Sequence, residues 1–364
     1  MKRFNVGIIG CGNISGIYFK NMTGPFAKQL NVVGCADLDA GRSKAKADEY
    51  KVKAMSVAEM LADKSIDIIV NLTIPKAHFD VSVQAVEAGK HVYAEKPMTL
   101  TRDQGRMLLD KAKARNVRIA NAPDTVLGAA HQTARKLIED GVIGTPVSAT
   151  AFMQCHGHES WHPDPEFYYH VGGGPMFDMG PYYLTALVNM LGPVARVTGS
   201  ARISFPTRTI TSAKKNGTIV PVEVPTHISG VLDFSSGAIG TIITSFDVWR
   251  ATLPCIEVHG SLASMSVPDP NGFGGDVKIW KPGMKDWEVV PSTHPYPENS
   301  RGIGVADMAA AIEANIQHTA NGELAYHVLD IMHAVHDASA QGKHVLMQSH
   351  CVRPIAQPTT SRWA

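Results

Sequence analysis

The sequence predicts an α/β protein with two domains. The first is a doubly wound parallel sheet over residues 1–122, and the second is an α/β domain with a mostly antiparallel sheet over residues 123–364. The chain of 364 residues is long for one domain. In its first third, short apolar segments alternate with amphipathic helical ones, which indicates a parallel sheet covered on both faces. After Pro123 the pattern changes to period-two segments separated by turn residues, which indicates a sheet with one covered face.

The N-terminal elements follow from this alternation of apolar and amphipathic stretches. Gly89 lies just past one helix end and Thr101 opens the next helix, and both are suitable cap residues. The expected strands cover residues 4–9, 32–36, 66–72, 91–94 and 117–120, and the expected helices cover residues 14–22, 42–50, 77–88 and 101–115.

In the C-terminal part, a helix over residues 126–140 is expected to lead through Gly141 and Gly144 into a strand over residues 147–152. Further strands and two closing helices follow from the same patterns. These strands cover residues 195–203, 227–234, 238–245, 256–259 and 277–280, and the helices cover residues 302–317 and 323–340.

The composition is that of an ordinary globular protein, with 44% hydrophobic and 18% charged residues. The formal net charge is +1 and no basic stripe is present, so nucleic acid and anionic membranes are not expected as partners. The five cysteines are scattered and form no C-x-x-C pair. The N-terminal apolar run is too short for a signal peptide, so a reduced, cytoplasmic protein is expected.

A glycine-rich turn follows the first expected strand. Gly10 allows a tight turn, and Gly12 lets the backbone approach a pyrophosphate. Ser15 stands where the third glycine of G-x-G-x-x-G belongs, a position that needs only a small residue. Asn13 and Ile14 complete the turn, and the helix that follows presents free N–H groups to phosphates. We therefore expect a dinucleotide site here.

Asp37 supports that interpretation, because it ends the second expected strand about twenty residues beyond the glycines. An acid there accepts hydrogen bonds from the adenosine ribose and repels a 2′-phosphate. We expect NAD rather than NADP as the cofactor, although Arg42 nearby is a feature that NADP could use.

Three segments carry a family resemblance. Residues 88–97 read A-G-K-H-V-Y-A-E-K-P, residues 73–78 read T-I-P-K-A-H, and residues 172–182 read G-G-G-P-M-F-D-M-G-P-Y. In this order and spacing they closely resemble the signatures of the glucose–fructose oxidoreductase and inositol dehydrogenase family (Gfo/Idh/MocA). The resemblance covers nearly the whole chain.

The resemblance implies a Rossmann domain followed by an α/β domain with a large open sheet, with substrate between them. It also implies a homo-oligomer, a dimer or a tetramer. By the same resemblance Lys96 contacts both the substrate and the nicotinamide region. The implied cofactor site is further lined by Leu72, Thr73, His78 and Glu95.

Asp178 and Tyr182 take the places of the family's catalytic carboxylate and its histidine or tyrosine partner. Tyrosine there resembles the glucose–fructose oxidoreductase and dihydrodiol dehydrogenase branches. Four residues apart on an expected helix, the two side chains would share one face. Oxidising an alcohol requires removal of its hydroxyl proton. We expect Lys96 and Tyr182 to relay that proton, with the formal base left open, and Asp178 to hold a substrate hydroxyl and Lys96.

A polar segment over residues 154–164 is a candidate for substrate contact. On a continuing strand, His156 and His158 would face the same side as Gln154, and Trp161 could stack on the apolar face of a sugar. Asp124 is also expected to contact the substrate. A metal site is the other functional reading of this segment, since His156, His158, Glu159, His162 and Asp164 are potential ligands. Their spacing fits no dedicated zinc pattern, so we do not expect a metal. Substrate binding is the favoured interpretation of this segment, and a structural loop is the second.

The sequence thus predicts an NAD-dependent dehydrogenase or reductase acting on a carbinol carbon of a sugar, polyol or related polyhydroxylated molecule. One alternative is a lyase or glycosidase that retains NAD and uses transient oxidation. Another is a non-catalytic NAD-binding regulator, which would not need Lys96, Asp178 and Tyr182 together. The sequence does not distinguish pentose from hexose or polyol from glycoside.

Overall fold

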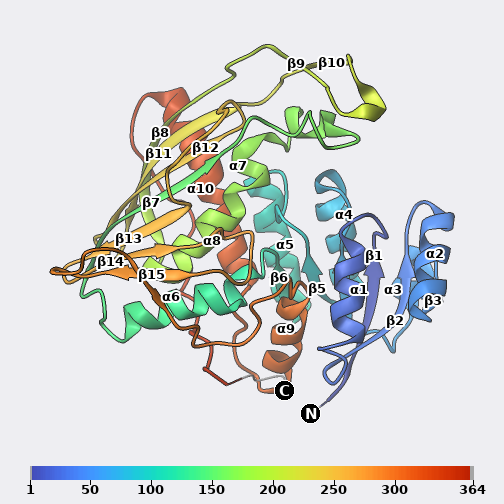
Figure 1. Cartoon of the computed structure of the whole chain (residues 1–364). Coiled ribbons are helices and arrows are strands. Elements are labelled where there is room, and N and C mark those ends of the chain that lie inside the picture. The colour runs from blue at the N-terminus through green and yellow to red at the C-terminus, as the bar shows by residue number, and fades with distance from the viewer. Residues whose placement is uncertain (1, 361–364) are drawn as a thin grey trace. The chain divides into compact units, whose positions relative to one another are not determined.

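The computed structural model describes residues 2–360, which form two compact units (Figure 1). Unit 1 contains residues 2–129, 294–329 and 354–360 of the described chain, and unit 2 contains residues 130–293 and 330–353. The N-terminal unit therefore includes two C-terminal segments as well as the region that the sequence pattern assigns to it. No helix within residues 2–360 is both long and apolar enough to cross a membrane.

Unit 1 is built on a six-stranded sheet in which every pairing is parallel. Its strands are β1 (Phe4–Ile9), β2 (Leu30–Ala36), β3 (Lys53–Ala54), β4 (Ile68–Asn71), β5 (His91–Ala94) and β6 (Ile119–Asn121). The order β3-β2-β1-β4-β5-β6 reverses direction between β1 and β4. In such sheets ligands bind outside the carboxyl ends of the strands, at this reversal point.

The helices of unit 1 begin at well-formed caps. The Asp39 side chain accepts from backbone N–H groups at the start of α2, Ser56 forms a capping box with Glu59 on α3, and Thr101 caps α5. The helical elements are α1 (Ser15–Thr23), α2 (Ala40–Tyr50), α3 (Val57–Ala62), α4 (Pro75–Glu87), α5 (Arg102–Ala114), η1 (Thr125–Leu127) and α9 (Ile303–Glu313). Helix α9 packs against β6 and α1. Its expected continuation to residue 317 is wrong, because Asn315 adopts a left-handed φ of 51°.

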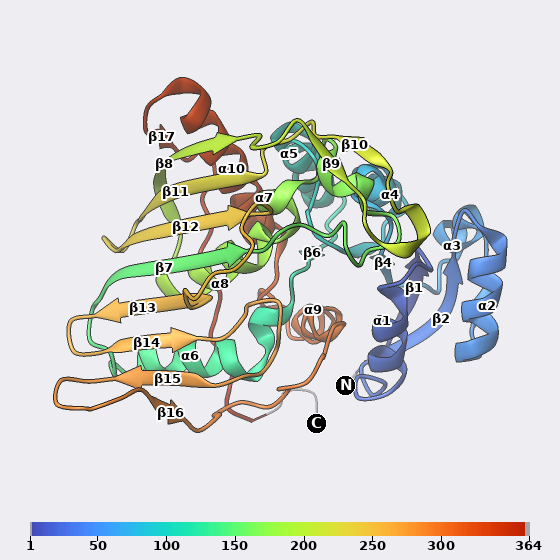
Figure 2. The same cartoon turned by 45° about the horizontal axis from the view of Figure 1, so that its top comes forward.

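Unit 2 is built on a nine-stranded mixed sheet in the order β16-β15-β14-β13-β7-β12-β11-β8-β17 (Figure 2). Strand β7 pairs in parallel with β12 and antiparallel with β13, and the other pairings are antiparallel. Its strands are β7 (Pro146–Gln154), β8 (Val194–Arg202), β11 (His227–Phe234), β12 (Ile239–Ser245), β13 (Ile256–Gly260), β14 (Ser264–Val267), β15 (Val277–Trp280), β16 (Glu288–Val290) and β17 (Val345–Leu346). A separate hairpin pairs β9 (Thr207–Thr209) with β10 (Ile219–Pro221).

Side chains along β11 alternate strictly between buried and half-exposed, as expected for a sheet with one covered face. Helix α8 packs against β7, and all twelve of its residues are buried. The remaining helical elements are α6 (Ala129–Glu139), η2 (Pro165–Tyr169), α7 (Gly174–Asp178), α8 (Gly180–Leu191), η3 (Ala213–Lys215) and α10 (Gly322–Gln341).

Candidate active site

The glycine turn of unit 1 lies between β1 and α1. Gly10 has a φ of +102°, and a Cβ there would lie 2.6 Å from the Leu72 carbonyl group, so only glycine fits. At Gly12 a Cβ would meet nothing within 4 Å. The backbone at Gly12 therefore leaves open space where the sequence predicts a pyrophosphate.

Ser15 replaces the third glycine without disturbing the turn. Its side chain is fully buried, and its hydroxyl donates to the Gly12 carbonyl over 2.7 Å. Helix α1 starts at Ser15, and Ile14 before it makes no side-chain cap hydrogen bond. The Ser15 N–H donates to the Gly12 carbonyl over 3.1 Å, and the absence of a side-chain cap at Ile14 suits a phosphate at this helix start.

Asp37 is tied to the glycine turn. One carboxylate oxygen accepts from the Cys11 N–H over 2.7 Å, and the other accepts from the Asp39 N–H over 2.8 Å. A carboxylate has about four acceptor positions, so Asp37 keeps capacity for ribose hydroxyls. Arg42 instead lies 3.4 Å from the Asp39 carboxylate, with both side chains more than half exposed.

Two exposed apolar side chains that the sequence interpretation missed flank this turn, which also contains the predicted Ile14. Leu38 follows β2 and is fully exposed, and Ile74 follows β4 and is 67% exposed. Exposed aliphatic groups at the carboxyl ends of β2 and β4 could cover the faces of an adenine ring. They were not predicted because a single apolar residue in a loop has no periodic signal.

The loops after β4 and β5 are joined through His78, which is 1% exposed. Its ring nitrogens lie 2.9 Å from the Thr73 carbonyl and 2.7 Å from the Pro97 carbonyl. Burial is the largest cause that lowers the pKa of His78. The buried Asn71, which the sequence interpretation missed, accepts from the Thr73 hydroxyl over 2.6 Å. His78 therefore holds the backbone on both sides of the expected cofactor loops.

Glu95 and Lys96 leave β5 at the same sheet edge. One Glu95 carboxylate oxygen accepts from the Lys96 N–H over 3.0 Å, and the other accepts from the Tyr18 hydroxyl over 2.8 Å. Burial raises the pKa of Tyr18 well above its ordinary value, so Tyr18 keeps its proton for this bond. Lys96 itself is half-buried, and its peptide bond to Pro97 is cis. Glu95 thus fixes the backbone that presents Lys96.

Asp124 does not lie where the sequence interpretation expects it. Its side chain is 1% exposed, and one carboxylate oxygen accepts from the N–H groups of Gly302 and Gly304 over 2.9 and 3.1 Å. It anchors the start of α9, and burial raises its pKa. This arrangement argues against direct substrate contact by Asp124.

In unit 2, His158 lies next to the predicted catalytic carboxylate. Its Nε2 is 3.3 Å from Oδ2 of Asp178, and both side chains are largely buried. The ring centroid also lies 4.1 Å from Tyr168, 4.7 Å from Phe246 and 5.2 Å from Trp161. Two residues predicted separately, one as a substrate contact and one as catalytic, therefore form one pair.

Two expectations about backbone geometry in unit 2 are wrong. β7 ends at Gln154 and Gly157 turns the chain with a φ of +75°, so strand alternation does not extend to His158. Asp178 and Tyr182 do not share a helix, since α7 ends at Asp178 and α8 begins at Gly180. Pro181 has no N–H with which to continue the first helix, which explains the break.

A buried ion cluster, also missed from the sequence, supports the His158 loop. The Arg208 guanidinium donates to Glu159, to Asp247 over 3.0 Å and to the Phe246 carbonyl over 2.6 Å. Each of these three charged side chains exposes less than one-tenth of its surface. Arg208 comes from β9 and Asp247 from the loop after β12, so the cluster joins three segments distant in sequence.

The potential metal ligands of this segment have other partners. Glu159 pairs with Arg208, and Asp164 pairs with Lys214 and Lys215. Within residues 2–360, no group of three or more histidine, cysteine or acidic side chains is arranged to hold a metal ion.

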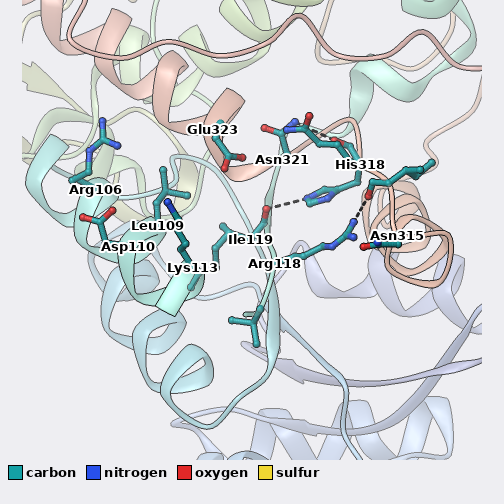
Figure 3. Close-up of a pocket in the computed structure, with 14 residues that line it drawn as sticks. Arg106, Leu109, Asp110, Lys113, Arg118, Ile119, Asn315, His318, Asn321 and Glu323 are labelled. Atoms are coloured by element: carbon teal, nitrogen blue, oxygen red, sulfur yellow. Dashed lines mark hydrogen bonds between the residues drawn. The ribbon is translucent and has the colours of Figure 1, made fainter. Parts of the chain in front are cut away.

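A surface pocket of about 600 Å³ lies elsewhere on unit 1 (Figure 3). Basic residues Arg106, Lys113 and Arg118 and acidic residues Asp110 and Glu323 surround it. It lies at the amino end of β6, whereas the glycine turn and Lys96 lie at the carboxyl ends of the strands. Because its charges are of both signs and it lies at the opposite sheet edge, we do not assign it to the cofactor.

Two family models match the chain. Residues 4–122 match the model described as an oxidoreductase family with an NAD-binding Rossmann fold, and residues 131–266 match the GFO/IDH/MocA C-terminal domain.

Known proteins resemble the chain at low identity. A 1,5-anhydro-D-fructose reductase of Ensifer adhaerens is 27% identical over 324 residues, which are 86% of this chain and 90% of that protein. An uncharacterized oxidoreductase of Schizosaccharomyces pombe is 30% identical over 160 residues, but this chain spans only 42% of its length. The structure of levoglucosan dehydrogenase in complex with NADH and L-sorbose superposes with a TM-score of 0.81 at 19% identity, covering 96% of this chain and all of that one.

Proposed function

Because the chain belongs to the GFO/IDH/MocA family of oxidoreductases, with its NAD-binding Rossmann domain, we propose that it transfers a hydride between NAD and a carbinol carbon of a sugar, polyol or related polyhydroxylated molecule. The observation that carries this proposal is the shared edge of the unit 1 sheet. The open backbone at Gly12, the Asp37 carboxylate and Lys96 all follow carboxyl ends of its parallel strands.

The residues of this edge fit a dinucleotide. Gly10 and Gly12 leave backbone room for the pyrophosphate, and the uncapped start of α1 offers N–H donors to it. Asp37 keeps acceptor positions for the ribose and disfavours a 2′-phosphate, so NAD is preferred to NADP. When bound, the nicotinamide supplies the site that accepts or gives up the hydride.

The protein's own task is then to hold the reacting carbon and to move one proton. Lys96 donates a hydrogen bond to the reacting oxygen and stabilises its developing negative charge. Asp178 fixes the orientation of His158, and Tyr182 is the second candidate for the proton relay. Lys96 and Tyr182 remain the two candidates for the formal base, and the imidazole of His158 is added as a neighbouring acceptor.

The sugar class is supported by the names of relatives of low identity. The Ensifer adhaerens relative is a 1,5-anhydro-D-fructose reductase, and it aligns with most of both chains. We also propose a homo-oligomer and a cytoplasmic location. The five scattered cysteines, which form no C-x-x-C pair, support the latter.

The direct test is NADH absorbance on mixing the purified protein and NAD with a panel of sugars, polyols and sugar acids, repeated with NADP. A signal with NAD that exceeds the NADP signal is expected. If no compound of the panel gives an absorbance change and the purified protein contains bound NAD, the lyase or glycosidase alternative would be supported instead. The matched variants are Lys96→Met, which should keep NADH affinity but lose turnover, and Lys64→Met, which should keep both. Unchanged turnover in Lys96→Met would remove this lysine from the mechanism.

A further inference from the structure

Trp249 is an exposed aromatic side chain that the proposed function leaves unexplained. It lies in the loop after β12, and 83% of its surface is exposed. One face of its indole stacks on the His156 imidazole, with ring centroids 3.4 Å apart and an interplanar angle of 12°. An aromatic ring fixed on one side and open on the other can bind a flat apolar surface.

The loops beneath this ring pair are held rigidly. Val248 donates its N–H to the Cys155 carbonyl over 3.0 Å, which links the loop after β12 to the loop after β7. Arg208 donates to the carbonyl groups of His156 and Phe246, over 3.4 and 2.6 Å. Because these hydrogen bonds already hold the backbone of both loops, ligand binding would cost less ordering entropy than at a loop without them.

The loop after β7 also carries His158, whose partner Asp178 is the last residue of α7. Strands β7 and β12 are parallel neighbours, so their loops leave the sheet at the same edge. Phe246 contacts the His158 ring at 4.7 Å and is three residues before Trp249. Trp161, which is 61% exposed, also contacts the His158 ring, with ring centroids 5.2 Å apart. Two exposed indoles thus lie on the loops that surround one candidate reaction centre.

We propose that Trp249 forms a second ring-binding subsite and that the preferred substrate is a glycoside with at least two rings, such as a disaccharide. This inference rests on the proposed function, since it names the substrate class of that site. One sugar ring contacts Trp161 and His158, and the next ring places its C–H face on the open face of Trp249. Exposed Arg250 and Thr252 follow Trp249 in the loop and offer hydrogen bonds to the hydroxyl groups of that second ring.

The test compares the purified enzyme and its Trp249→Ala, Trp249→Phe and Trp280→Ala variants, each with NAD. Trp280 is also partly exposed, but it lies on β15, four strands from β12 in the sheet. Substrates are maltose, cellobiose and lactose, each against its constituent monosaccharides. We expect disaccharides to have the higher kcat/KM. Trp249→Ala should lower that value about tenfold while leaving monosaccharides unchanged. Trp249→Phe and Trp280→Ala should keep the preference.

A second measurement separates this inference from the proposed function. Calorimetric titration of the NADH-bound protein with the disaccharides reports binding without turnover, and Trp249→Ala should weaken it by a similar factor. Turnover of monosaccharides with no disaccharide preference and no effect of Trp249→Ala would overturn the subsite and leave the oxidoreductase proposal standing. Disaccharide binding that depends on Trp249, with no NADH formed from any sugar, would support the subsite and contradict the oxidoreductase proposal. A variant that changes only the oligomeric state in light scattering would assign Trp249 to a subunit contact and overturn the subsite.

Discussion

Asp178 and His158 form a hydrogen-bonded pair across 20 residues of sequence, with 3.3 Å between Oδ2 and Nε2. A carboxylate only accepts hydrogen bonds, so Nε2 of His158 carries a proton that it donates to Asp178. The aromatic rings of Trp161, Tyr168 and Phe246 restrict the imidazole further. This arrangement can hold one tautomer of a histidine in place, as a proton-transfer group requires.

Replacing Asp178 with asparagine should therefore lower kcat with sugar substrates by about 10²- to 10⁴-fold, because the tautomer and orientation of His158 are no longer fixed. NADH affinity, measured by fluorescence titration, should stay within about twofold, since unit 1 carries the dinucleotide residues. His158→Gln should cause a similar loss, and the double variant should lose little more than either single variant.

The matched control for that experiment is Glu223→Gln. Glu223 forms another carboxylate–imidazole pair, with His170 at 3.0 Å, but both side chains are at least one-third exposed. Its loss should leave kcat unchanged. Equal effects of the Asp178 and Glu223 substitutions would show that the His158 pair has no special part in turnover.

Asp37→Asn should weaken NADH binding about 10- to 100-fold, because hydrogen bonds to a charged acceptor are stronger than those to an amide. The affinity for NADPH should fall less than that for NADH, because the carboxylate that repels the 2′-phosphate is gone. The measurement is a titration of both cofactors with the wild type, Asp37→Asn and Asp48→Asn, the last an exposed acid on α2. An unchanged ratio of the two affinities in Asp37→Asn would contradict the assigned role of this carboxylate.

Sequence reasoning predicted the elements that carry a strong local signal. The strand over residues 91–94 and the strands over residues 227–234 and 277–280 have the predicted bounds. The glycine turn and Asp37 also lie together as expected, because their spacing within one βαβ unit fixes their positions. Short elements such as β3, β9 and β17 gave too few residues for a period to be recognised.

The rest of the candidate site depends on contacts that sequence spacing does not encode. The pairing of His158 with Asp178 requires the turn at Gly157 and the helix break at Pro181, each of which alters a regular pattern. Arg208 gave no signal, since its partners Glu159 and Asp247 are 49 and 39 residues away. Asp124 was predicted to contact the substrate. Its buried carboxylate instead accepts a hydrogen bond at the start of α9, which is distant in sequence.

Arg208→Met should reduce the free energy of unfolding by about 3–5 kcal/mol, because it leaves two buried carboxylates without their partner. The control is Arg196→Met, which breaks the Arg196–Asp233 pair at the surface and should cost about 0–1 kcal/mol. Chemical denaturation followed by fluorescence gives both values. A loss in Arg208→Met no larger than that in Arg196→Met would show that the buried cluster contributes little to stability.

Acid should destabilise unit 2 through His131, which is 1% exposed. Its Nε2 lies 3.2 Å from the Gly272 carbonyl oxygen. Burial lowers the pKa of His131 to about 4, whereas an unfolded histidine titrates near 6.5. Between these values the unfolded chain binds more protons, so stability rises with pH across this window and falls as the pH drops through it. The shift corresponds to about 3 kcal/mol of unfolding free energy for this group, lost in full by about pH 4.

His131→Gln should therefore show a shallower decline in unfolding free energy between pH 6.5 and 4 than the wild type, whereas the exposed His344→Gln should not. Identical pH slopes for wild type and His131→Gln would mean that the ring is not held neutral by the fold.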